Sequence, residues 1–216
     1  MSSLKLKHSG GNSVSLNPPS SAPTSSDVAF KLPNADGSAG QVLQTDGSGN
    51  LSWVTPGISE IDMWRISTSA NSNNSTTIMT SNWERSNATG FSKLGTGMSE
   101  SSGIFTFPST GIYRLEFQSL ATVAQSTSSS VAFIYIEATT NNSSYTEIIG
   151  QASSIGDAGG GGTLYYANFN AHTYLDVTDT SNIKVRFKLY SDGNVTWRGY
   201  TGYPSTYAIF TKVAET

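Results

Sequence analysis

The stretch from residue 103 to residue 117 most strongly limits the folds open to this chain. It contains two arms in which apolar and polar residues alternate, separated by Pro-Ser-Thr-Gly. Alternation with a period of two is typical of β-strands with one buried face. Pro108 fixes φ and Gly111 can adopt a positive φ, which favours a tight reversal. We therefore predict an antiparallel core hairpin whose buried side carries Phe105, Phe107, Tyr113, Leu115 and Phe117.

Composition also favours an all-β fold. Only 12% of the residues are charged, while Ser, Thr, Asn and Gly are abundant. These residues disfavour long helices, because they compete for backbone hydrogen bonds or raise the entropy of the unfolded backbone. A chain of 216 residues can hold one large β domain and an extended segment.

Charge and residue usage exclude several classes of function. The net charge of −3 and the isoelectric point near 5.3 provide no basic surface for a nucleic acid. Without cysteine, neither disulfides nor thiolate metal sites can form. No stretch approaches the roughly 20 apolar residues of a membrane span. The first residues lack the apolar core of a secretory signal, so we expect no signal peptide.

The pattern Phe-x-Phe-Pro-x-x-Gly-x-Tyr-x-x-x-Phe over residues 105–117 resembles that of the globular heads of the complement and tumour necrosis factor superfamily. Residues 131–137 stand where this family has its next core strand. Residues 174–187 are similar to its strand, polar turn and strand, and residues 205–213 to its last strand. The resemblance implies a jelly-roll sandwich that associates as a homotrimer.

The aromatic residues of this region exceed what one sandwich interior requires. Aromatic surface left over after folding would form an exposed patch, which association removes from water. We therefore assign nine residues to core or trimer packing: Phe105, Phe107, Tyr113, Phe117, Phe133, Tyr135, Phe187, Tyr207 and Phe210.

A second resemblance lies in residues 27–57. Two Asp-Gly steps, at 36–37 and 46–47, separate short apolar pieces and predict consecutive hairpins. The order of motifs is similar to a segment of tail and capsid fibres of tailed bacteriophages, where it precedes a trimeric tip. A generic hairpin linker with a buried Trp is the alternative. The matching residues are Leu32, Pro33, Gly37, Gly40, Gln41, Leu43, Thr45, Asp46, Gly47, Leu51 and Trp53.

Residues 1–26 open with Leu-Lys-Leu-Lys and continue as a tract rich in Ser, Pro, Gly and Asn. Its prolines exclude regular helix and favour an extended path. Such a tract cannot bury enough apolar surface to fold alone. It is either a disordered tail or an arm that becomes ordered on a partner, and the fibre resemblance favours a virion-attachment arm. We expect three parts: this arm, a hairpin shaft or linker over 27–57, and a head over 58–216.

Within the head, the apolar pattern predicts about eight to ten strands, as in jelly rolls. Strands are expected at 61–66, near Phe91 and Leu94, at 104–107, 112–117, 131–137, 164–170, 174–177, 183–190 and 207–213. Polar loops are expected at 67–77, 126–130 and 139–144, and a glycine-rich loop tip at 159–162.

No constellation of residues indicates catalysis. His8 and His172 are the only histidines and lie far apart in sequence, His172 in an expected turn. This supports neither a shared metal site nor a Ser-His-Asp nucleophile. Asp176, Asp179 and Asp192 are of the type that calcium prefers, and some relatives in the superfamily bind calcium, but Asp also caps turns. We predict turn roles and expect no catalytic residue, no metal and no cofactor.

One loop, residues 194–204, combines aromatic residues with arginine and glycine. Flat rings beside a guanidinium suit stacking on sugars or contact with a protein, whereas packing inside the sandwich or a subunit seam is the alternative. We expect Trp197 to pack and the two tyrosines to be exposed. The candidate receptor or glycan contacts are Trp197, Arg198, Tyr200 and Tyr203.

The two resemblances together imply a structural virion protein, a homotrimeric capsid or tail fibre assembled in the host cytoplasm. Its expected partners are itself, another virion protein through residues 1–26, and a host surface glycan or receptor, with no nucleic acid. A glycan- or receptor-binding module is the alternative hypothesis. A depolymerase of surface glycans has little support in the sequence.

Overall fold

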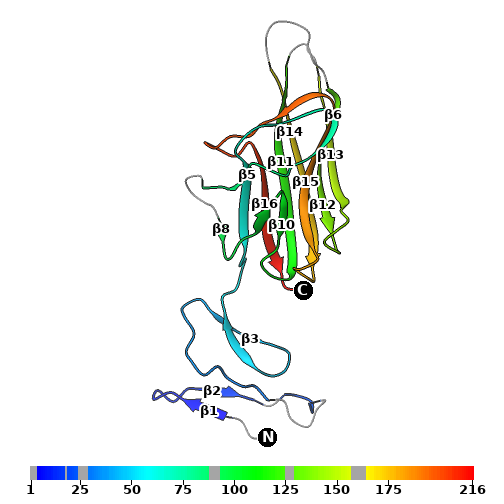
Figure 1. Ribbon diagram of the computed structural model, residues 1–216. Coiled ribbons are helices and arrows are strands. Elements are labelled where there is room, and N and C mark those ends of the chain that lie inside the picture. The colour runs from blue at the N-terminus through cyan, green and yellow to red at the C-terminus, as the bar shows by residue number, and fades with distance from the viewer. Residues whose placement is uncertain (1–3, 18, 24–28, 88–92, 125–128, 157–163) are drawn as a thin grey trace. The chain divides into compact units, whose positions relative to one another are not determined.

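The computed structural model of the protein is shown in Figure 1. It describes residues 4–17, 19–23, 29–87, 93–124, 129–156 and 164–216. By its internal contacts the chain divides into two compact units, Met1–Gly57 and Ile58–Thr216. All regular elements of the described residues are β-strands, which confirms the all-β class. Among those residues no helix is long and apolar enough to cross a membrane.

The first unit begins with a hairpin. β1 (Leu4–Lys7) pairs with β2 (Ser13–Leu16), and the backbone N–H of His8 donates to the carbonyl of Asn12 across the reversal. The reversal is possible because Gly11 adopts a φ of 92°. The composition of residues 1–26 predicts an extended path, and the structure adds this hairpin, in which two short alternating pieces meet.

The second hairpin of this unit joins β3 (Val42–Thr45) to β4 (Leu51–Val54). Its turn carries the second Asp-Gly step, and the Asp46 carboxylate accepts hydrogen bonds from the N–H groups of Ser48 and Asn50. The prediction that the first Asp-Gly step also closes a hairpin is wrong. That step lies beneath the Trp53 ring, where a Cβ on Gly37 would come within 2.6 Å of the indole.

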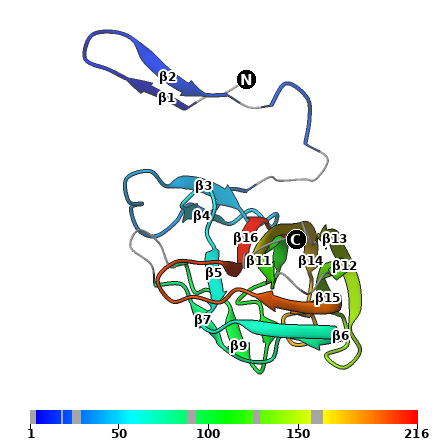
Figure 2. The same ribbon diagram turned by 90° about the horizontal axis from the view of Figure 1, so that it is seen from above.

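The second unit is a sandwich of two layers, seen from above in Figure 2. In the first sheet the order is β7–β5–β16–β11–β14, with β8 also paired with β5. In the second sheet β15 pairs with β12, β6 and β10, with β13 beyond β12 and β9 beyond β10. Ladder pairs Ala121–Trp197 and Thr122–Thr196 join the two sheets at one end. The strands are β5 (Ile61–Ile66), β6 (Ala70–Ile78), β7 (Trp83–Arg85), β8 (Lys93–Leu94), β9 (Ser99–Ser101), β10 (Ile104–Thr106), β11 (Gly111–Val123), β12 (Ser129–Thr139), β13 (Thr146–Ile155), β14 (Tyr165–Val177), β15 (Lys184–Trp197) and β16 (Thr206–Ala214).

The core hairpin predicted for residues 103–117 is wrong in its pairing. β10 pairs with β15 and β9, whereas β11 pairs with β14 and β16. The turn after Pro108 therefore crosses from one sheet to the other, and Gly111 adopts the positive φ of 141° that this crossing uses. The predicted buried faces are correct, because the rings of Phe107 and Tyr113 meet across the interior at 4.7 Å.

Several strand predictions in the head also need correction. Residues 70–78 form β6 rather than a loop, because their backbone pairs with β15. The strands expected at 164–170 and 174–177 are one strand, β14, so His172 lies in a strand and not in a turn. β15 extends to Trp197, into the expected 194–204 loop. Phe91 and residues 126–128 and 159–162 lie outside the described residues.

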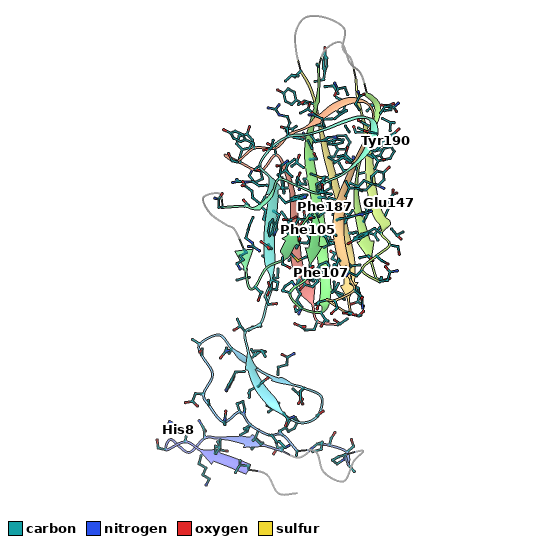
Figure 3. All side chains as sticks on the ribbon, in the orientation of Figure 1. His8, Phe105, Phe107, Glu147, Phe187 and Tyr190 are labelled. Atoms are coloured by element: carbon teal, nitrogen blue, oxygen red, sulfur yellow. The ribbon has the colours of Figure 1, made fainter. Side chains whose placement is uncertain are left out.

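The core is centred on the fully buried ring of Phe105. Its centroid lies 5.5 Å from Trp64 and 5.1 Å from Phe210 in the first sheet, and 5.4 Å from Phe187 in the second. Trp83 completes the cluster at 5.2 Å. Figure 3 shows Phe105, Phe107 and Phe187 between the layers, whereas Tyr190 lies on the outer side of the second sheet.

Substituting Phe105→Ala should destabilise the head by about 3–5 kcal/mol, because the cavity would open between both sheets. The melting temperature should fall by about 6–20 °C. Phe30→Ala is the matched control: Phe30 is 66% exposed, so its loss should change the free energy of unfolding by less than about 0.5 kcal/mol. Scanning calorimetry measures both. Equal melting temperatures for the two variants would contradict this assignment of the core.

Candidate functional site

The outward face of the first sheet is the first candidate surface. Ladder pairing arranges its side chains in rows across four strands. One row contains Met63, Ile209, Glu116 and His172, and the next contains Ile61, Thr211, Arg114 and Tyr174. We call these two rows the seam face.

The seam face is apolar where it crosses β5 and β16. Ile61, Met63 and Ile209 are only partly buried there, although the inward residues of the same strands already fill the core. On β11 the face carries an ion pair, with 3.3 Å between Arg114 and Glu116. Apolar side chains on the outer side of a sheet are typical of a surface that a further protein layer covers.

A groove lies beside the seam face, on the same side of the sheet. Its volume is about 400 Å³. Two amide side chains of β14, Asn168 and Asn170, and one of β11, Gln118, line it together with Tyr203 and Tyr207. The Tyr207 hydroxyl donates a hydrogen bond of 2.7 Å to Oε1 of Gln118. Burial, followed by the nearby Glu116 carboxylate, raises the pKa of Tyr207, so its hydroxyl stays protonated.

The loop from residue 198 to residue 205 forms one wall of this groove. Both of its ends are bonded to one residue of β11: the N–H of Arg198 donates to the carbonyl of Leu120, and the N–H of Leu120 donates to the carbonyl of Ser205. Gly199 allows the loop to approach β5–β6 closely, because a Cβ there would lie 2.3 Å from the carbonyl carbon of Thr68. The backbone thus fixes the loop on the sheet.

The structure separates the four candidate contact residues of this region. Trp197 is fully buried, donates from Nε1 to the Ser72 hydroxyl at 2.8 Å, and packs on Phe169. It is a core residue and not a surface contact. Arg198 is exposed, as are Tyr200 and Tyr203, whose rings lie 4.8 Å apart.

The nine aromatic residues assigned to packing also fall into two groups. Six are buried within this chain alone: Phe105, Phe107, Tyr113, Phe117, Phe187 and Phe210. Phe133, Tyr135 and Tyr207 are partly exposed and point outward, the first two from β12 and the third from β16. Only the second group is available to a partner.

The outer side of the second sheet carries a compact patch of rings and charges. Glu137 accepts from Arg186 at 2.6 Å and pairs with Lys188 at 2.9 Å, and Lys188 also contacts Glu147. The Lys188 ammonium lies 4.5 Å above the Tyr135 ring. Although partial burial alone would raise it, the hydrogen bonds from Lys188 and Arg186 hold the pKa of Glu137 below its usual value of 4.5. This patch is internally paired and stabilises the sheet.

The aspartates considered for calcium lie at separate positions. Asp179 accepts a hydrogen bond of 2.7 Å from the N–H of Ser181, which lowers its pKa, and the side chain of Asn182 donates to it as well. Asp192 accepts from the N–H of Val131, and Asp176 is exposed on β14. Within the described ranges, no group of three His, Asp or Glu side chains could hold a metal ion.

The groove residues Gln118, Asn168 and Asn170 were missed by the sequence analysis. Each lies at a polar position of an alternating strand, so their outward direction could have been inferred. Their proximity could not, because it depends on the pairing of β14 with β11, in which Gln118 lies opposite Asn170.

Comparisons with known proteins bear on the fold. No family model and no curated protein matches the sequence. The structure is similar to murine APRIL at pH 5.0, with a TM-score of 0.52 and 12% identity over 71% of this chain and 98% of that chain. Murine APRIL at pH 8.0 matches with a TM-score of 0.50 and 12% identity, over 71% of this chain and 98% of that chain. Eiger TNF from S. frugiperda matches with a TM-score of 0.49 and 10% identity, over 74% of this chain and 94% of that chain.

At these identities the likeness concerns the fold alone. The predicted fold class is confirmed: the second unit is an all-β jelly-roll sandwich of the type found in tumour necrosis factor-like heads.

Glu137→Gln should cost about 1–3 kcal/mol of stability at pH 7, because it removes the negative charge and replaces one of the two acceptor oxygens that face Arg186 and Lys188 with an NH₂ donor. The folded state lowers the pKa of Glu137, so its contribution is complete above pH 4.5 and is lost as the pH falls through the lower folded-state value. The stability difference between the parent and the variant should therefore shrink towards pH 3.

Denaturant titrations between pH 7 and pH 3 test this expectation. Glu147→Gln is the control, since that carboxylate is 50% exposed and should contribute only about 0–1 kcal/mol. If the difference in unfolding free energy between the parent and Glu137→Gln stays constant over the whole pH range, the ion-pair assignment is refuted.

Proposed function

We propose that this chain is the subunit of a homotrimeric fibre on the virion of a tailed bacteriophage, with the first unit attaching to the particle and the jelly-roll head projecting as a receptor-binding tip. The observation that carries the proposal is the seam face, which leaves Ile61, Met63 and Ile209 partly exposed on one chain. Association would remove this surface from water. The expected number of subunits, three, comes from the resemblance of the head to the trimeric heads of the complement and tumour necrosis factor superfamily.

The phage-fibre motif in residues 27–57 supports the virion part of this proposal. Several of its residues contact one another within this segment. The indole of Trp53 covers Gly37 and donates to the carbonyl of Ala35 at 3.0 Å, and Gln41 accepts from the N–H of Ser38 at 2.7 Å. Gly47 adopts a φ of 78° after Asp46. These contacts give several motif residues a structural role in this segment, which supports a fibre element over a featureless linker.

Attachment through the N-terminal hairpin is supported by its uncovered apolar face. Leu4, Leu6 and Leu16 lie on one side of the β1–β2 ladder and are 60%, 63% and 68% exposed. A single two-stranded hairpin is marginally stable in water, and an uncovered leucine face adds no stability. A groove on another virion protein that covers these leucines would order the hairpin.

The full-length chain should form a trimer, with a mass by light scattering of about three times 22.9 kDa at micromolar concentration. Ile209→Glu should place a charge in the seam and weaken association by more than about 100-fold, since burying an unpaired charge costs on the order of 3 kcal/mol or more. Thr76→Glu, on exposed β6 of the other sheet, should leave the mass unchanged. A monomeric parent protein would rule the proposal out.

Leu6→Asp should abolish incorporation into virions while leaving the head trimeric, because it puts a charge on the apolar side of the β1–β2 hairpin. Ser13→Asp changes the opposite side, since Ser13 pairs with Lys7, and should incorporate normally. Particles purified from cells that express either variant are probed for the protein by immunoblotting. Normal incorporation of Leu6→Asp would show that attachment uses another surface.

A further inference from the structure

We propose that the groove between the 198–205 loop and strands β11, β14 and β16 binds a short neutral saccharide. This inference rests on the proposed receptor-binding role of the head and gives that role a ligand class. The groove's volume of about 400 Å³ lies at the lower end of the range for small-molecule sites, and suits a mono- or disaccharide.

The polar groups of the groove match the hydroxyl groups of a sugar. Asn168, Asn170 and Gln118 each supply an amide, which offers both donors and acceptors, as a sugar hydroxyl does. Among the described residues, neither the Asn168 nor the Asn170 side chain makes a hydrogen bond, so both are available to a ligand. Because Oε1 of Gln118 already accepts from Tyr207, its NH₂ group is oriented to donate.

An aromatic ring stands at the rim of these amides. Tyr203 is 62% exposed and lines the groove, and Tyr200 supports its ring at 4.8 Å. Tyr200 is itself held against the backbone, since a Cβ on Gly202 would come within 2.3 Å of its ring. Sugar rings present C–H groups on one face, and an exposed aromatic ring beside polar groups is suited to stack on that face.

The loop that carries these rings is positioned before any ligand arrives. Arg198 and Ser205 are both bonded to Leu120, and the N–H of Tyr200 donates to the carbonyl of Ile66 at 3.1 Å. Loops fixed in this way lose little conformational entropy on binding. The site is therefore a pre-formed concavity, and not a mobile surface that must be ordered.

Charge selects the class of saccharide. The lining residues are Gln118, Ser119, Leu120, Asn168, Phe169, Asn170, Tyr203, Pro204, Ser205 and Tyr207, and none of these is charged. Acidic sugars and phosphates are bound chiefly by arginine or lysine, which the lining does not supply. The groove therefore favours neutral sugars. A shallow neutral site binds weakly, and three copies on one fibre tip would raise the avidity for a repeating polysaccharide.

The test uses the full-length chain with a panel of neutral disaccharides built from glucose, galactose, mannose, rhamnose or N-acetylglucosamine, and with sialyllactose as the charged comparator. Saturation-transfer NMR detects binding and calorimetry gives the affinity. At least one neutral disaccharide should bind at millimolar concentration, and more tightly than sialyllactose. Absence of binding by every neutral member, or preference for the charged sugar, would overturn the inference.

Variants then assign the binding to the groove. Tyr203→Ala and Asn168→Asp should each weaken binding by at least about tenfold, whereas Tyr203→Phe keeps the ring and should stay within about threefold. Tyr166→Ala is the matched control, because Tyr166 is also 62% exposed but does not line the groove. If Tyr203→Ala and Tyr166→Ala lose saccharide affinity equally, or if neither loses affinity, the saccharide binds outside the groove.

Light scattering on the same samples separates this inference from the proposed function. A trimer that binds no neutral sugar contradicts the saccharide site alone. A monomer that binds sugar through Tyr203 contradicts the trimeric fibre and leaves the saccharide site standing.

Discussion

The contact on which the head depends is the meeting of both sheets at the Phe105 ring. Phe105 enters from β10, a strand of only three residues, yet its ring touches Trp64 and Phe210 of one sheet and Phe187 of the other. With Trp83, four rings surround it, which allows little change in the spacing of the sheets, because dense interiors transmit small displacements. The turn after Pro108 then carries the chain from the second sheet into β11 of the first, so the same short segment connects the layers both covalently and by packing. This arrangement explains why the segment has aromatic residues in both arms.

Filling the interior in this way determines what the outer faces can carry. Side chains alternate from Tyr113 to Leu120 on β11 and along β14 and β16, so once the inward residues there meet the aromatic core, the intervening residues face outward. On β16 the outward residues Tyr207, Ile209 and Thr211 alternate with Thr206, Ala208 and Phe210 inside. A strand with apolar residues on both sides is suited to burial on both sides. On β14 the outward residues are uniformly exposed and mostly polar. The outer face of this sheet is therefore apolar on the β16 side and polar on the β14 side. The apolar side is suited to self-association, and the polar side is suited to a groove for a polar ligand.

The sequence was sufficient for the class of fold and for the buried face of most strands, because alternation reports directly which side chains are inside. It was not sufficient for strand partners. Alternation shows which face of the sheet a residue lies on, but it does not show which strand pairs with its own. For this reason the two arms around Pro108 were predicted to pair with each other. The prediction of a loop at residues 67–77 was wrong for a related reason. A run of Asn, Ser and Thr has little strand propensity of its own. It becomes β6 because it pairs with β15 and because the Ser72 hydroxyl bonds to Trp197 and Ser191. Tyr203 could be selected as exposed because glycines flank its loop. The amides opposite it could not be selected, since Gln118 and Asn170 become neighbours only through the register of β11 and β14.

Strand β11 links the two proposed surfaces of the head. Its outward residues Arg114 and Glu116 belong to the seam face, Gln118 lines the groove, and Leu120 holds both ends of the 198–205 loop through its backbone. A shift of β11 along the sheet would therefore change the seam, the amide and the aromatic loop together. Association along the seam face would fix β11 from outside, as the Phe117 and Phe187 contact at 4.6 Å fixes it from inside. A trimer of this head would thus hold the saccharide groove more rigidly than a single chain could, without contributing any atom to it. Under that coupling, assembly and recognition are not independent properties of the head, because both depend on the register of one strand.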